Sequence, residues 1–171
     1  MENSIIKEQV NQWYLDYSND IYQYVLFMIG DHERAKDFMQ ETFLLAFDKY
    51  TSFQGGSAKG WLFRIARNLT IDFIRKDRPI AYLFNRTPYI ASEINTPEKI
   101  ATLNETEKEL YCALHKLRRA HRDVIILRKI KDFSIQETAN ILEWSESKVK
   151  TTLLRGLKAL KEQLEKEGFS Q

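Results

Sequence analysis

Residues 134–160, SIQETANILEWSESKVKTTLLRGLKAL, predict two helices joined by a tight turn. Ser134 and Glu137 have the spacing of a capping box, in which a hydroxyl and a carboxylate satisfy N–H groups that a new helix leaves unpaired. We therefore place the start of the first helix at Ser134. A polar interruption ends this helix before Ser145, which is a second N-cap. A capped helix, a tight turn and a longer helix form a helix-turn-helix.

The second helix of this motif has an apolar side and a cationic side. Val149, Leu153, Leu157, Leu160 and Leu164 recur at three-and-four spacing and are expected to face a core. The opposite side carries Lys148, Thr151, Arg155 and Lys158, with Ser147 and Leu154 at one edge and Lys150 on its flank. Such cations bind phosphates or guanine edges, and Thr or Leu contacts a thymine methyl. A solvated face is the alternative, but the capped helix before it favours DNA reading.

The composition is that of a soluble helical protein of 171 residues, long enough for one medium domain or two small ones. Glycine and proline are sparse and the apolar residues follow the helical period, which predicts an all-α fold. Cys112 is the only cysteine, so no internal disulfide is expected, and no zinc-ligand spacing is present. We predict no metal and no cofactor. Without a bilayer-length apolar run or a signal peptide, we expect a cytoplasmic protein without membrane insertion.

The net charge of +2 is unevenly distributed. The first fifty residues are acidic, whereas positive charge concentrates at residues 59–78 and again at 116–161. This pattern predicts two separate nucleic-acid contacts and an acidic region that faces another partner.

The acidic region lies on a predicted helix that Asp31 caps, after an earlier buried stripe that ends at Gly30. Its outer face carries Asp37, Gln40, Glu41, Leu44 and Asp48. Two carboxylates four residues apart could form a catalytic pair or half a metal site, but His32, His115 and His121 are scattered without a matching motif. We interpret the face as solvated or partner-binding and predict no catalytic residues.

The first basic region follows a glycine-containing loop, and Ser57 is the expected cap of its helix. The helix WLFRIARNLTIDFIRK, residues 61–76, is predicted to bury Leu62, Ile65, Ala66, Leu69 and Phe73 and to expose Arg64, Arg67, Asn68, Ile71 and Arg75. Arginines among aromatic residues can bind phosphates and hold an unstacked base. Burial in a helical core is the alternative for Trp61 and Phe63.

Periodicity fails after residue 77, where Pro79, Pro88 and Pro97 interrupt the chain. We predict an N-terminal domain at 1–78, a linker at 79–103 and a C-terminal helix-turn-helix domain at 104–171. The fold class is therefore all-α, with two small helical domains joined by a linker.

Taken together, these motifs resemble those of a bacterial sigma factor of the extracytoplasmic-function group in the sigma-70 family, over nearly the whole chain. DFMQE at residues 37–41 is similar to the family's DxxQE segment, and WLFRIARN at 61–68 is similar to its minus-ten segment. The closing helix-turn-helix resembles the domain that reads the minus-thirty-five element.

The resemblance implies roles and partners for these residues. Asp37, Gln40 and Glu41 would bind core RNA polymerase, through its beta-prime clamp and beta subunits. Minus-ten DNA would meet Phe53, Ser57, Lys59, Trp61, Arg64, Arg67, Asn68 and Arg75, with a flipped base received by the 53–59 loop. Minus-thirty-five DNA would meet Ser147, Lys148, Lys150, Thr151, Leu154, Arg155 and Lys158. A membrane-bound anti-sigma factor is also implied.

The chain departs from the family pattern near the loop. Gln54, Gly55 and Gly56 stand where many members have Arg-Gly before the loop serine, and Gly60 replaces a bulkier or hydroxyl residue. The expected function is a non-catalytic initiation subunit that recruits polymerase to promoter DNA. The rival is a dimeric helix-turn-helix regulator of duplex DNA, which leaves the acidic face and the first basic region without a role.

Overall fold

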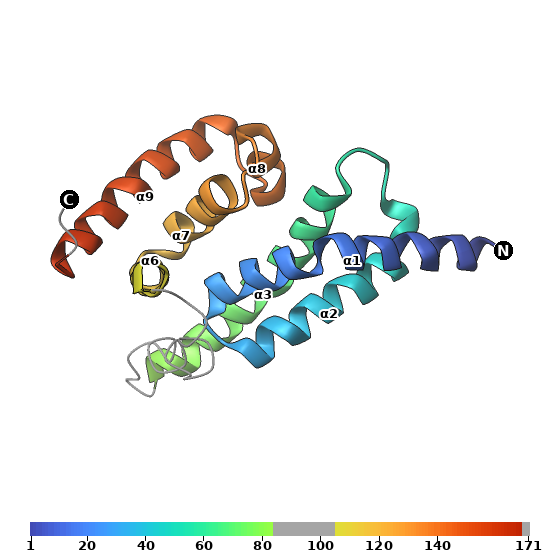
Figure 1. Cartoon of the computed structure of the whole chain (residues 1–171), viewed down its shortest axis with the longest axis horizontal. Helices are drawn as coiled ribbons and strands as arrows, with labels where there is room; N and C mark the ends of the chain where they lie inside the picture. Colours follow the sequence, from blue (N-terminus) through green and yellow to red (C-terminus); the bar gives the residue numbers. More distant parts are fainter. Residues whose placement is uncertain (84–104, 169–171) are drawn as a thin grey trace.

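The computed structural model describes residues 1–83 and 105–168, and every regular element within them is helical (Figure 1). The first group contains α1 (Glu2–Ile29), α2 (His32–Asp48), the short turn η1 (Tyr50–Ser52) and α3 (Ala58–Leu83). The second contains α6 (Glu105–His115), α7 (Arg119–Ile125), the π-helical turn η2 (Ile126–Ile130), α8 (Ile135–Leu142) and α9 (Glu146–Lys166). The predicted all-α class with two helical domains is confirmed.

The boundaries of the first three helices follow from local capping. Gly30 ends α1 in the left-handed conformation with φ 78°, and Asp31 accepts a hydrogen bond from the Arg34 N–H at 3.2 Å. Ser57 accepts from the Gly60 N–H at 3.0 Å at the start of α3. These caps, all expected from the sequence, fold the chain back on itself between the helices.

The core of the first domain lies between α1, α2 and α3. The predicted stripe on α1 is fully buried: Ile21, Tyr24, Val25 and Met28. The predicted exposure of Ile71 is wrong, because its side chain is only 3 % exposed. Helix α3 packs against α1, α2 and α8, so more of its circumference is covered than one apolar stripe indicates.

The helix-turn-helix has the predicted caps. Ser134 accepts from the Glu137 N–H at 3.0 Å, and Ser145 accepts from the Lys148 N–H at 3.1 Å. Between the two helices, Glu143 adopts a left-handed conformation with φ 58°, which makes the turn tight. Val149 is buried, and the other leucines of the predicted apolar side are half-buried: Leu153, Leu157, Leu160 and Leu164.

Helix α9 approaches α7 closely at Gly156. A Cβ at this position would lie 3.3 Å from both the His121 Cβ and the Ile125 Cδ1, which is tighter than an ordinary contact. Glycine in a helix interior costs about 0.5–1 kcal/mol relative to alanine. The close packing of the two helices is therefore obtained at a local loss of helix propensity.

The predicted linker overlaps the end of α3. The helix continues to Leu83, into the segment assigned to residues 79–103, and the remaining part of that segment, with Pro88 and Pro97, lies outside the described residues. The domain boundaries therefore stay predictions. In the part of the chain that the structure describes, no helix is long and apolar enough to cross a membrane.

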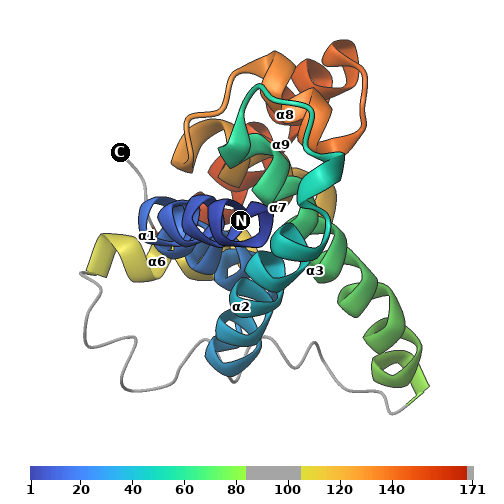
Figure 2. The same cartoon turned by 90° about the vertical axis from the view of Figure 1, so that its right-hand side faces the viewer.

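The two domains are in contact along two lines. Helix α8 packs on α3, while α6, α7 and η2 pack on α1 (Figures 1 and 2). Phe63 on α3 meets Phe133 edge to face with ring centroids 4.9 Å apart, and the Tyr111 hydroxyl donates to the Leu26 carbonyl at 3.2 Å. The C-terminal domain therefore lies directly over part of α3.

Candidate nucleic-acid interface

The acidic face of α2 is exposed. Asp37, Gln40 and Glu41 lie on the surface, and Leu44 beside them is 68 % exposed. The opposite side of α2, including Ala35 and Phe43, is buried against the rest of the domain. Carboxylates around an exposed leucine are suited to contact another protein, since apolar groups on a polar surface commonly mark binding sites.

An aromatic cluster supports the loop between η1 and α3. Trp13 stacks on Tyr50 at 5.6 Å and meets Phe53 at 5.2 Å and Trp61 at 6.0 Å, both edge to face. Trp13 is 6 % exposed, whereas Phe53 and Trp61 are half-buried. The loop after Phe53 is therefore fixed at its base and presents two aromatic rings partly to solvent.

Trp13 was missed as a supporting residue because the periodicity around it is weak. Its only sequence signal is an aromatic side chain near the start of a long helix. At the loop tip, Gly55 and Gly56 have φ of 87° and 81°, a conformation that other residues adopt only with strain. A Cβ at either glycine would meet nothing within 4 Å, so backbone geometry, rather than crowding, requires glycine here.

The basic side of α3 is divided between solvent and the C-terminal domain. Arg64, Asn68 and Arg75 are exposed, and Arg67 is half-buried. Phe63 is fully buried, so the core alternative holds for this residue. Ser57 and Lys59, the remaining minus-ten candidates, lie at the beginning of α3, exposed and half-buried respectively. The structure thus brings the predicted residues onto one loop and one helix.

A buried carboxylate joins the two domains. Asp123 on α7 is 1 % exposed; its Oδ1 accepts from the Tyr24 hydroxyl at 2.8 Å and its Oδ2 from the Arg67 Nε at 3.0 Å. Burial raises the pKa of Asp123 above its ordinary value, and the Arg67 charge and the hydrogen bonds from Tyr24 and Arg67 offset part of that rise. We call Tyr24, Arg67 and Asp123 the interdomain cluster.

Two further ion pairs cross between the domains. The Lys131 Nζ lies 2.9 Å from Asp20 Oδ1 and also donates to the Gln23 side chain, and Arg64 pairs with Glu143. Burial acts to raise the pKa of Asp20, but the hydrogen bonds and charges of Lys131 and, to a smaller extent, Lys59 outweigh it, so that the pKa lies below its ordinary value. Lys131 is 9 % exposed, so its ammonium group would be a nearly buried, unpaired charge without Asp20, which is strongly destabilising.

The outward side of α9 is open to solvent. Ser147, Lys148, Lys150, Thr151, Leu154, Arg155 and Lys158 are all exposed. Leu154 is 73 % exposed, an unusual position for a leucine unless it contacts a partner. The Lys148 Nζ lies 4.4 Å from the centroid of the Trp144 ring, which holds this cation at the start of the helix.

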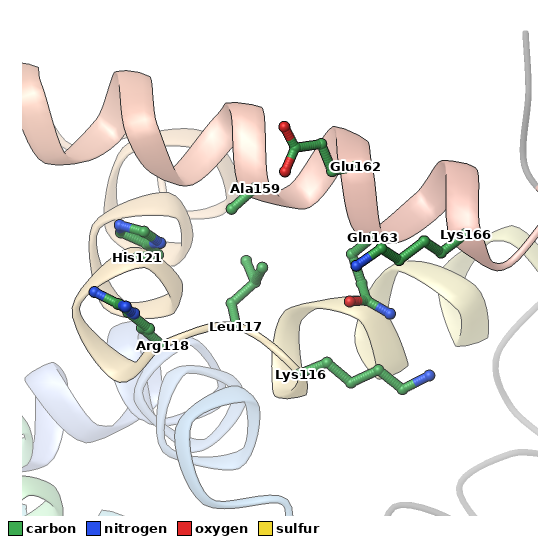
Figure 3. Close-up of a pocket in the computed structure, with 8 residues that line it drawn as sticks. All are labelled: Lys116, Leu117, Arg118, His121, Ala159, Glu162, Gln163 and Lys166. Carbon is green, nitrogen blue, oxygen red and sulfur yellow. The ribbon is translucent and has the colours of Figure 1, made fainter.

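Within residues 1–83 and 105–168, no group of three or more acidic, histidine or cysteine side chains could hold a metal ion. A shallow depression between α9 and the turn before α7 has a volume of about 230 Å³ (Figure 3). Substrate pockets are usually about 300–1,000 Å³ and mostly apolar. This depression is lined largely by polar and charged side chains, including Lys116, Arg118 and Glu162, and is not of that kind.

The structure combines an exposed acidic face on α2, a loop on an aromatic base beside a basic helix, and a helix-turn-helix whose second helix has an exposed cationic side; such a two-domain helical protein is suited to binding DNA. Comparison with known proteins identifies the class. Residues 13–80 match the family model of sigma-70 region 2, and residues 107–160 match that of sigma-70 region 4.

Relatives match along most of their length. The chain is 37% identical to the ECF RNA polymerase sigma factor SigX of Bacillus subtilis over 94% of this chain and 86% of that protein. It is 32% identical to the sigma factor YlaC of the same organism, over 94% of each chain. The sigma factor RpoE of Bartonella quintana, solved with the anti-sigma factor NepR, has a TM-score of 0.77 at 25% identity, over 92% of this chain and 98% of that one.

The chain belongs to the extracytoplasmic-function group of sigma-70 RNA polymerase sigma factors. Proteins of this class are in general non-enzymatic subunits of transcription initiation. The matches to both regions do not favour a dimeric regulator that acts without polymerase.

Proposed function

We propose that this sigma factor recruits core RNA polymerase through the acidic face of α2. Asp37, Gln40 and Glu41 project from one exposed side of a helix whose other side is fixed in the core. This rigid support means that little conformational freedom is lost on binding, which favours affinity. The beta-prime clamp and the beta subunit are the expected polymerase partners.

The second proposed role is melting of the minus-ten element by the loop and the basic side of α3. The loop that follows Phe53 receives an unstacked base, Asn68 helps to position it, and Arg64, Arg67 and Arg75 hold backbone phosphates. The contact set also includes Ser57, Lys59 and Trp61. Unstacking a base costs only a few kcal/mol, so binding energy from aromatic and phosphate contacts is enough and no nucleotide hydrolysis is required.

The third proposed role is reading of the minus-thirty-five element by α9. Lys150, Thr151, Leu154 and Arg155 enter the major groove, while Ser147, Lys148 and Lys158 contact its edges. The 73 % exposure of Leu154 is the observation that most favours this role, because an apolar side chain in that position gains from meeting a thymine methyl.

The single observation that carries the proposal is the coexistence of two separate basic surfaces and one acidic face in the same chain. A duplex-binding regulator requires only α9. A factor that positions polymerase at two promoter elements requires all three surfaces.

Run-off transcription with purified core polymerase tests the proposal. Adding the chain should produce a defined transcript from its promoter, and double substitution at Asp37 and Glu41 should remove that transcript. Binding of the same proteins to an isolated minus-thirty-five duplex, measured in parallel, tests the DNA-binding role of α9 separately from transcription. Tight duplex binding without transcription from any candidate promoter would contradict the sigma role and support the regulator.

We further infer that the protein acts in the cytoplasm without catalytic residues and without a cofactor. An anti-sigma factor is the proposed inhibitor, because the structural relative from Bartonella quintana was solved with one. A membrane-bound form of that inhibitor would connect the sigma factor to an external signal.

A further inference from the structure

The contacts between the two domains use cations of the proposed minus-ten surface. Arg64 and Arg67, both assigned to minus-ten phosphates, pair with Glu143 and Asp123 of the C-terminal domain. Lys59, from the same set, pairs with Asp20 at 3.4 Å and lies 5.5 Å from the centroid of the Phe133 ring. Three cations of one proposed DNA surface are therefore engaged within the protein itself.

The other two surfaces are accessible in the same arrangement. Asp37, Gln40 and Glu41 are exposed on α2, and the seven proposed contact residues of α9 are exposed as well. The C-terminal domain therefore engages Arg64 and Arg67 of the minus-ten surface, while Ser57, Asn68 and Arg75 of the same set stay exposed.

We propose that this arrangement is a self-inhibited state, in which Asp123 and Glu143 occupy the guanidinium groups that otherwise bind minus-ten DNA while polymerase binding remains possible. The inference rests on the proposed function of α3 and adds its regulation. Polymerase would bind the covered form first, and the domains would separate before the promoter strands do.

Competition for Arg67 follows from the geometry of the interdomain cluster. The Asp123 carboxylate is almost completely buried and is satisfied by two donors, Tyr24 and Arg67. If Arg67 turns to a phosphate, the buried carboxylate loses one of its two donors and the cation bonded to it, and only the charge of Arg122 remains nearby. Removing the bonded partner of a buried charge is strongly unfavourable. DNA binding by Arg67 and burial of Asp123 therefore oppose each other, which favours separation of the domains.

The ion pairs that hold the C-terminal domain against α3 differ in strength. The Arg64 and Glu143 side chains are 49% and 59% exposed, so water and salt weaken their attraction. Lys131 is held more firmly by Asp20 and Gln23; Asp20 also pairs with Lys59 of the minus-ten set, but Lys131 itself is assigned to none of the three proposed binding surfaces. It can therefore be altered without touching a residue assigned to polymerase or DNA.

The first experiment measures a distance in the full chain. Spin labels are placed on cysteines introduced at the exposed positions Glu8 on α1 and Glu165 on α9, with Cys112→Ser as the background. The wild-type contacts should give mainly one distance. Lys131→Glu places a carboxylate opposite Asp20, and Glu143→Lys places an ammonium opposite Arg64; each should broaden the distribution and shift it.

The second experiment measures binding of a labelled single-stranded DNA of randomised sequence by the free chain. Both variants should bind it more tightly, by roughly three- to thirtyfold, since an attractive pair becomes a repulsive one. Lys131→Glu makes the chain more acidic, and net charge alone would therefore lower its affinity for DNA. The expected rise in affinity has the opposite sign and points to opening of the domains. Affinity for core polymerase should stay within about twofold of wild type, the level at which surface substitutions are near neutral.

Matched controls separate opening from net charge. Lys129→Glu makes the same charge reversal at an exposed neighbour of Lys131 and should slightly weaken DNA binding. Glu162→Lys repeats the Glu143→Lys change at an exposed position on α9 and should leave the distance unaltered. Circular dichroism confirms that each variant is folded. If Lys131→Glu and Lys129→Glu weaken DNA binding equally, or if neither opening variant changes the distance, the proposal is overturned.

A chemical lock tests the order of events. Cysteines replacing Asp20 and Lys131 in the Cys112→Ser background are joined by a short, reducible bismaleimide. The locked chain should still bind core polymerase but should not open promoter DNA, and reduction should restore opening. Normal promoter opening by the locked chain overturns self-inhibition. Absence of transcription by the unlocked wild type, with the distance shifts intact, would instead contradict the sigma role alone.

Discussion

The Arg67 Nε of α3 lies 3.0 Å from the Asp123 Oδ2 of α7, although 56 residues separate them in the chain. The Tyr24 hydroxyl meets the other oxygen of the same carboxylate from α1. One buried side chain of the C-terminal domain is thus bonded to two helices of the N-terminal domain. Changes at this carboxylate should affect both domains together.

Removing the Tyr24 hydroxyl should loosen the domains without disturbing the core. Tyr24→Phe keeps the ring among its neighbours but leaves the Asp123 carboxylate with one donor fewer, which costs about 1.5–3 kcal/mol for a hydrogen bond to a charged group. The label distance described above should broaden accordingly. Tyr17→Phe removes a hydroxyl from the same helix outside the cluster and should have no such effect.

The acidic face of α2 should be needed for polymerase and not for folding. Asp37→Ala combined with Glu41→Ala is expected to weaken binding to core polymerase at least about tenfold, the effect of losing one well-placed interface residue. Both side chains are exposed, so the melting temperature should hardly change. Unaltered polymerase affinity in a titration would refute the assignment.

Substitution of Arg155 should show whether its side chain reads a base edge or binds a phosphate. If its guanidinium reads a base edge, Arg155→Ala should cost about 1–3 kcal/mol on the promoter duplex and relax the preference at one base pair. Binding of a panel of single-base promoter variants provides the measurement. An equal loss on every duplex, with a smaller salt dependence, would make Arg155 a phosphate contact.

The cap of the recognition helix should contribute measurably to stability. Ser145→Ala removes the oxygen that accepts the Lys148 N–H and should lower the free energy of unfolding by about 1 kcal/mol. Ser147→Ala, in the first turn of the same helix, is the matched control. Chemical denaturation in urea compares the two, and equal losses would show that Ser145 is not acting as a cap.

The pairing of Lys131 with Asp20 predicts a pH effect. Lys131→Met removes a cation that lowers the pKa of Asp20, so this pKa should rise toward its ordinary value. Because the pKa of Asp20 is lower in the folded protein than in the unfolded chain, its carboxylate stabilises the folded arrangement at any pH above the ordinary pKa. This stabilisation is lost as the pH falls through the lower pKa of the folded protein. Carboxyl NMR should follow Asp20 individually, because the raised pKa of Asp123 acts in the opposite direction. Lys129→Met should leave Asp20 unchanged.

Features that depend on neighbours in the sequence were predictable. The cap at Ser134 follows from its three-residue spacing to Glu137, and the cap at Ser145 follows from the break in the helical pattern before it. The buried stripe around Tyr24 follows from the helical period. The exposed residues of α9 are what remains when its apolar side is assigned. Local capping and amphipathicity decide these features, so a single sequence is sufficient to find them.

Features that depend on how the domains meet were not predictable from these patterns. The partners Tyr24 and Asp123 are 99 residues apart, and neither belongs to a motif that indicates the other. The burial of Ile71 was not predictable from one apolar stripe, because α3 packs against three helices, α1, α2 and α8. Trp13 was overlooked because its contacts with Tyr50 and Phe53 arise only after α1 lies against the loop.

Gly156 has a consequence for how promoter preference can change. It lies on the side of α9 that faces His121 and Ile125, away from the proposed DNA contacts, and its missing side chain lets the two helices approach. A larger residue at position 156 requires His121, Ile125 or α9 itself to give way, and a shift of α9 would change the angle at which the proposed contacts Arg155 and Leu154 approach a groove. We therefore expect promoter preference to respond to a position on the side of the helix that faces away from the DNA.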